Sequence, residues 1–147
     1  MNLDDNELRQ ALALMDAYKD RVEAMSRQVQ VLRMSLDEVS LALEAVKAFK
    51  DAKEGDEIMV PVGASCYIPV KVTSNRSVIT GIGSGISVQK TSDESIDYLE
   101  GNSAEITEAL KKSVEALNEA QQNLAGMSDA VQQEYAARRR ASGANVQ

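Results

Sequence analysis

The sequence contains no histidine and no tryptophan, and it has one cysteine and one phenylalanine among its 147 residues. Without histidine, Cys66 has no obvious partner for metal binding or for thiol nucleophilic catalysis. A single cysteine also allows no disulfide within the chain. We therefore predict a protein that is not an enzyme, with no catalytic residue, no metal site and no cofactor, in which Cys66 is a small buried hydrophobe.

Long apolar runs and long basic blocks are missing as well. The longest apolar run is far too short to span a bilayer, and no apolar signal segment is present. The net charge of −7, without a basic stripe that could follow a phosphate backbone, argues against nucleic acid as the main ligand. We expect a cytoplasmic protein that binds neither a membrane nor nucleic acid.

Aromatic residues make up only 3% of the chain, which argues against a thick globular core. An apolar content of 44% with 27% charged residues is typical of long helices and coiled coils. Six of the eight glycines and both prolines lie between Gly55 and Gly101, where β-branched residues are also concentrated. The layout predicts one domain, residues 1–147, with a small β insert between two long helices.

The first long segment follows a heptad repeat, and we place its helix at residues 4–53. All twelve core positions are apolar, an outcome with a chance probability of about one in twenty thousand at this apolar content. A seven-residue repeat of this length predicts a left-handed coiled coil with a partner helix. The a positions are Leu8, Met15, Val22, Val29, Leu36 and Leu43, and the d positions are Ala11, Tyr18, Met25, Leu32, Val39 and Val46.

The second long segment, residues 92–140, begins with the capping-box pattern Thr91 to Glu94 and supplies the partner helix. Eight of the ten core positions from Leu99 to Val131 are apolar, and the seam then becomes polar at Glu134 and Arg138. The alternative is a helix broken at Gly101-Asn102. The Arg138–Arg140 run places cations near the helix C-terminus, where the helix dipole favours them, and its role is otherwise open. Residues 141–147 are expected to be a disordered tail.

Residues 57–90 carry two matched alternating patterns, each interrupted by a glycine-containing turn, which predict two β-hairpins. Isolated hairpins are marginal in water, and their open edges and apolar face favour pairing with other subunits. The predicted fold is α+β and mostly α: a long antiparallel coiled-coil hairpin with two β-hairpins, which strands from other subunits complete into an intersubunit β-barrel or sandwich. The predicted oligomerisation residues are Ile58, Val60, Val62, Ile68, Val70, Val78, Ile82, Ile86 and Val88.

Apolar side chains from both helices should meet at the tip of the coiled coil, where flexible methionine and leucine side chains could contact many apolar segments. For Leu8, Met15 and Val131, continuation of the coiled-coil core is the competing interpretation. We call these side chains the tip residues: Leu3, Leu8, Leu12, Met15, Met127, Val131 and Tyr135.

This order of helix, paired hairpins and returning helix resembles the α-type subunit of archaeal prefoldin. The resemblance includes Val60-Pro61-Val62-Gly63-Ala64 in the first hairpin and Ile82-Gly83-Ser84-Gly85 in the second. It implies a heterohexamer of two α and four β subunits, with a hairpin platform and projecting arms. It further implies ATP-independent capture of unfolded client proteins, with the tip residues as the client-binding residues, and delivery of these clients to a group II chaperonin. The alternative function is a structural coiled-coil scaffold or tether that binds one folded partner.

Overall fold

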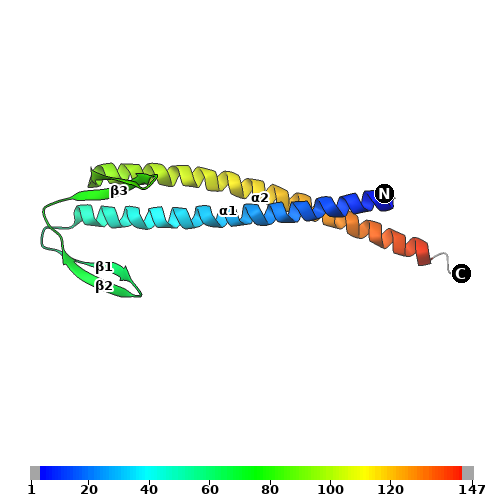
Figure 1. The fold of residues 1–147 in the computed structure, drawn as a ribbon, viewed down its shortest axis with the longest axis horizontal. Coiled ribbons are helices and arrows are strands. Elements are labelled where there is room, and N and C mark those ends of the chain that lie inside the picture. The colour runs from blue at the N-terminus through cyan, green and yellow to red at the C-terminus, as the bar shows by residue number, and fades with distance from the viewer. Residues whose placement is uncertain (1–3, 144–147) are drawn as a thin grey trace. The chain divides into compact units, whose positions relative to one another are not determined.

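The computed structural model describes residues 4–143 and contains two long helices and two β-hairpins (Figure 1). This arrangement confirms the predicted fold class, with two antiparallel hairpins between two helices. In chain order, the elements are α1 (Asp5–Asp51), β1 (Glu57–Gly63), β2 (Cys66–Lys71), β3 (Ser77–Gly83), β4 (Ile86–Thr91) and α2 (Ser92–Gly143).

A capping box starts α1. The Asp4 carboxylate accepts hydrogen bonds from the backbone N–H groups of Asn6 and Glu7, at 2.8 and 2.7 Å. The Glu7 carboxylate in turn accepts the Asp4 N–H at 2.7 Å, so that N–H groups at the helix start have partners. The helix ends at Asp51, two residues before the predicted end, and Gly55 follows with a left-handed φ of 90°.

A second capping box starts α2. Thr91 donates its backbone N–H to the Glu94 carboxylate at 2.9 Å, and Glu94 donates its N–H to the Thr91 hydroxyl at 3.2 Å. The helix continues through Gly101 and Asn102, so the alternative of a break at these residues is wrong. It also continues to Gly143, which places residues 141–143 in the helix and not in the predicted tail. Residues 144–147 lie outside the described part of the chain.

Each hairpin is an antiparallel pair with a tight turn and one bulge. In the first, Ile58 pairs with Val70 and Val60 pairs with Ile68; Ala64 and Ser65 form the turn with φ values of 49° and 59°. The register shifts between Pro61 and Gly63, so that strand alternation is interrupted just before the turn. The second hairpin has the same shift between Gly81 and Gly83.

The chain divides into two compact units, each of which contains parts of both helices. The first unit consists of residues 1–33 and 108–147, of which the structure describes 4–33 and 108–143. We call it the helix-pair unit. Residues 34–107, with both hairpins, form the hairpin unit. In the helix-pair unit, Asp5 of α1 pairs with Arg138 of α2, and in the hairpin unit Lys47 pairs with Glu100. Lys50 pairs with Asp93 in the hairpin unit as well, so the helices run antiparallel in that unit.

The predicted heptad seam of α1 is the covered face of that helix. All twelve of its a and d positions are buried or half-buried, and Leu8 and Val29 are the most buried among them. Four large apolar side chains of α1 outside the seam are instead exposed, by between 53% and 67%: Leu14, Val31, Met34 and Leu41. The heptad pattern thus identified the packed face correctly.

Candidate interaction surfaces

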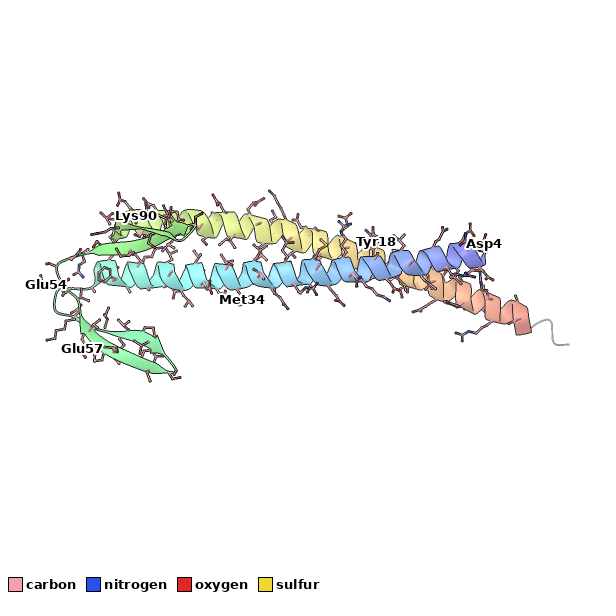
Figure 2. The ribbon with its side chains drawn as sticks, viewed as in Figure 1. Asp4, Tyr18, Met34, Glu54, Glu57 and Lys90 are labelled. Atoms are coloured by element: carbon pink, nitrogen blue, oxygen red, sulfur yellow. The ribbon has the colours of Figure 1, made fainter. Side chains whose placement is uncertain are left out.

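The first hairpin exposes apolar side chains on both faces. Every residue of β1 and β2 is exposed, including Val60 at 39% and Ile68 at 50%. Figure 2 draws the side chains of this hairpin, which begins at Glu57. On the other face, Met59 is 59% exposed and Tyr67 is 57% exposed. A contiguous apolar surface of this kind is unfavourable in water and is typical of a surface that a partner covers.

The second hairpin differs because one of its faces packs against the start of α2. The Thr80 and Ser95 hydroxyls form a buried hydrogen bond at 2.9 Å, and Ser95 is completely inaccessible to solvent. The Lys90 ammonium lies 5.7 Å from the centre of the Tyr98 ring, within cation–π range. This hairpin is therefore anchored to α2.

The structure places most of the predicted oligomerisation residues on the protein surface. The two half-buried members of the set are Val78 and Val88, both in the anchored hairpin. The exposed members are Ile58, Val60, Val62, Ile68, Val70, Ile82 and Ile86. Each hairpin forms its own two-stranded sheet, so all four strands have an edge without a strand neighbour within residues 4–143. Such edges can pair with strands of other chains.

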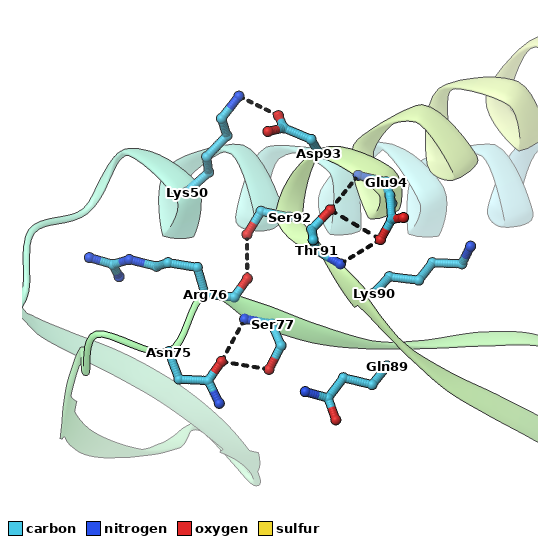
Figure 3. Close-up of a pocket in the computed structure, with 10 residues that line it drawn as sticks. All are labelled: Lys50, Asn75, Arg76, Ser77, Gln89, Lys90, Thr91, Ser92, Asp93 and Glu94. Atoms are coloured by element: carbon cyan, nitrogen blue, oxygen red, sulfur yellow. Dashed lines mark hydrogen bonds and ion pairs between the residues drawn. The ribbon is translucent and has the colours of Figure 1, made fainter.

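Arg76 ties together three elements at the base of the hairpins (Figure 3). Its guanidinium donates to the backbone carbonyl of Ala52, just after the end of α1, at 2.6 Å. It also lies 5.5 Å from the centre of the ring of Phe49, in the last turn of α1. Its own carbonyl accepts a hydrogen bond from the buried Ser92 hydroxyl at 2.8 Å. Because these contacts join α1, β3 and α2, they fix where the second hairpin leaves the helices. The heptad and strand patterns gave no signal for this role.

A surface cavity of about 650 Å³ lies beside this junction, and one ion pair, Lys50–Asp93, lies in its lining. Lys50 contacts Asp93 at 2.5 Å, and this hydrogen bond raises the Lys50 pKa. Hydrogen bonds from the backbone N–H and then the hydroxyl of Thr91 lower the pKa of Glu94. Within this lining, Thr91 and Glu94 form the capping box of α2, which Figure 3 shows.

Cys66 is exposed at the turn end of the first hairpin, so the prediction that it is buried was wrong. The error has a physical reason: the whole hairpin on which it lies is uncovered in the single chain. Across residues 4–143, no group of three or more acidic, cysteine or histidine side chains is arranged to hold a metal ion. Neither helix in this range is long and apolar enough to cross a membrane.

The predicted client-binding residues lie in the helix-pair unit, and they differ in exposure. Leu8 and Val131 are both 7% exposed, as the competing core interpretation requires of them. Leu12, Met15 and Met127 are half-buried, whereas Tyr135 is 41% exposed. Leu3 lies outside the described residues. Client binding at these side chains stays a prediction.

Two polar residues continue the seam beyond Val131. Glu134 is 5% exposed, and its carboxylate accepts a hydrogen bond from the Arg138 guanidinium at 3.2 Å. Arg138 also donates to Asp5 at the start of α1, at 2.6 Å, and these two hydrogen bonds raise its pKa. The sequence showed that the seam becomes polar here. It did not show that the polar residues form an ion-pair network joining α1 and α2.

Comparison with known proteins identifies the class to which this chain belongs. A model of the prefoldin subunit family matches residues 18–137, so the chain is a member of the prefoldin family and a chaperone-type subunit. It is similar to the prefoldin subunit alpha of Methanothrix thermoacetophila, with 28% identity over 108 residues that cover 74% of this chain and 71% of the relative. It is also similar to the prefoldin subunit alpha of Pyrococcus horikoshii, with 30% identity over 116 residues that cover 74% of this chain and 77% of the relative. The resemblance to the α type is confirmed.

Two solved structures share the fold. A cryo-EM structure of filamentous PFD from Methanocaldococcus jannaschii matches with a TM-score of 0.55 and 22% identity, covering 87% of this chain and 98% of that chain. The crystal structure of the prefoldin beta subunit from Thermococcus strain KS-1 matches with a TM-score of 0.60 and 14% identity, covering 90% and 96%. At these identities the likeness concerns the fold. Family membership and these neighbours support other prefoldin subunits as partners.

Proposed function

We propose that this protein is a subunit of a cytoplasmic, ATP-independent holdase that captures unfolded proteins and transfers them to a group II chaperonin. In this proposal, two copies assemble with four β-type prefoldin subunits. The observation that carries it is the first hairpin, whose strands are exposed throughout and apolar on both faces in a chain of the prefoldin family.

The hairpins supply the oligomerisation platform. Strands from neighbouring subunits pair with their open edges and complete an intersubunit β-barrel around the Val60 and Ile68 face. The anchored second hairpin holds this platform to α2 through Thr80 and Ser95. Burial of the apolar face against other subunits supplies the driving force for assembly, because apolar surface is then removed from water.

Client capture takes place at the ends of the helices in the helix-pair unit. Each end offers few accessible apolar side chains, among them Tyr135 and the half-buried Leu12 and Met15. A single end therefore binds weakly, since capture also restricts the unfolded client. Several subunits in one complex raise the effective concentration of these contacts, which gives avidity while each contact still dissociates fast. Release on this mechanism needs no nucleotide.

The platform is tested by the mass of the complex. We expect Val60→Asp to prevent assembly, because it places a charge on the face that other subunits cover. Ile79→Asp is the matched control: Ile79 is 69% exposed and belongs to a strand of the anchored hairpin, but not to the predicted oligomerisation set. Mass should be measured for each variant alone and with a β-type partner. Assembly of the Val60 variant at full mass would exclude this face from the interface.

Client capture is tested by removing residues 1–12 together with residues 132–147. We expect this truncation to abolish suppression of client aggregation and to leave the mass of the hetero-oligomer otherwise unchanged, because the hairpins are untouched. If the truncated complex still protects clients, the helix ends are not the binding sites.

One observation favours the alternative function, a scaffold or tether that binds one folded partner. Besides its apolar side chains, the end of α2 carries a charged cavity whose lining includes Tyr135, Arg139 and Arg140. A tether predicts protection of one client or none in an aggregation assay, whereas the holdase predicts protection of several unrelated clients.

A further inference from the structure

The last turns of α2 form a cavity that neither the heptad seam nor the hairpins explain. Its volume is about 550 Å³, and it is lined by Gln132, Tyr135, Ala136, Arg139 and Arg140. These residues follow one another at helical spacing on one face of α2. All of them are exposed, so the face is uncovered within the described part of the chain.

The three consecutive arginines at this end divide into two groups. Arg138 is half-buried and already engaged with Glu134 and Asp5. The guanidinium groups of Arg139 and Arg140, by contrast, make no ion pair with any residue between 4 and 143, and both line the cavity. No acidic residue follows Glu134 in the sequence. In a chain with net charge −7, this is a local surplus of positive charge beside an exposed aromatic ring.

Favourable interaction with the helix dipole explains why arginines are tolerated at a helix C-terminus. It does not explain why two of them line a cavity together with Tyr135. Guanidinium groups bind carboxylates through paired, charge-assisted hydrogen bonds, and the adjoining tyrosine ring offers a flat apolar surface on which another ring can stack.

We propose that the Tyr135–Arg139–Arg140 cavity binds an acidic segment of another protein, one that presents an aromatic side chain next to its carboxylates. Two cations that form no ion pair within residues 4–143, on a strongly acidic chain, are too small a patch to follow a nucleic acid backbone, which favours a protein segment as the occupant. The cavity shares Tyr135 with the proposed client-capture surface, but this proposal does not rest on client capture, because its recognition is electrostatic and needs a charged partner.

The test uses the full-length chain and a short fluorescent peptide that repeats glutamate and phenylalanine, with binding measured by anisotropy. The double variant Arg139→Gln/Arg140→Gln should bind this peptide at least about tenfold more weakly, since both charge-assisted contacts are lost. The matched control, Arg27→Gln/Arg33→Gln, removes the same charge from exposed positions of α1 and should change affinity less than about twofold. Circular dichroism confirms that each variant retains its helices.

Two further probes test the chemistry of the site. Replacing glutamate by glutamine in the peptide should reduce binding as strongly as the double variant does, and Tyr135→Ala should remove the preference for phenylalanine over serine in the peptide. The proposal is overturned if the wild-type chain does not bind the acidic peptide, or if the control variant loses as much affinity as the double variant. Equally tight binding of a short oligothymidylate would also overturn it, because the site would then respond to negative charge of any kind.

Discussion

The sharpest stability prediction uses two valines that lie two residues apart on α1. Val29 is a seam residue and is 5% exposed, whereas Val31 lies outside the seam and is 61% exposed. Both belong to the helix-pair unit. Replacing each by alanine makes the same chemical change on the same helix, so the two variants differ in burial alone.

The expected magnitudes follow from the exposed fractions. Burial of the two methyl groups that alanine lacks is worth about 1.6 kcal/mol, at ~0.8 kcal/mol for each. Val29 at 5% exposure loses nearly all of this, and Val31 at 61% exposure loses about 0.6 kcal/mol. Alanine is the better helix former by about 0.6 kcal/mol at both positions. We therefore expect Val29→Ala to cost about 1 kcal/mol plus a cavity contribution, and Val31→Ala to be close to neutral.

The assay is urea unfolding followed by circular dichroism, at one fixed protein concentration because assembly makes stability concentration-dependent. Val29→Ala should lower the unfolding midpoint, and Val31→Ala should leave it within error of the wild type. Equal losses in the two variants, or a larger loss for Val31→Ala, would refute the assignment of the packed face.

Three further predictions concern polar contacts. Thr80→Val should destabilise the protein by about 1–3 kcal/mol, because it leaves the buried Ser95 hydroxyl without a partner, and adding Ser95→Ala should recover most of that loss in urea unfolding. Arg138→Leu should lower the thermal midpoint, because the buried Glu134 carboxylate loses its ion pair to Arg138. The double variant Glu134→Leu/Arg138→Leu should have a thermal midpoint equal to or above that of the wild type. A double variant less stable than the single one would contradict this. Hydrogen bonds lower the folded-state pKa of Glu94, so its contribution to the stability of the fold is present above the ordinary pKa of 4.5. This contribution is lost as the pH falls through the lower folded-state pKa. The difference in thermal midpoint between Glu94→Gln and wild type should therefore be seen at neutral pH and vanish in acid.

Much of the fold was predictable because long periodic segments carry strong local information. The twelve apolar heptad positions of α1 identified its packed face, and the capping-box pattern at Thr91 marked the start of α2. The competing break at Gly101-Asn102 was wrong because one glycine costs only about 1 kcal/mol in a helix, which packing of the surrounding turns offsets. The helix likewise extended past residue 140, since nothing before Gly143 breaks it.

The interaction surfaces were less predictable because they depend on contacts between segments that lie far apart in the sequence. Strand alternation pointed to the hairpins, but it did not show that the second hairpin is anchored through Thr80 and the first is exposed on both faces. The role of Arg76 depends on Ala52 and Phe49, which are more than twenty residues away. At the other end of the chain, the arginine run gave no indication that Arg138 is paired while Arg139 and Arg140 line a cavity.

The central claim is that this chain forms part of a chaperone that needs no nucleotide. The most direct test is an aggregation assay with several unrelated unfolded proteins, in which the chain is assembled with a β-type prefoldin partner and ATP is left out. We expect the complex to suppress aggregation of all of them in proportion to its amount. Protection of one protein only, or of none, would contradict it.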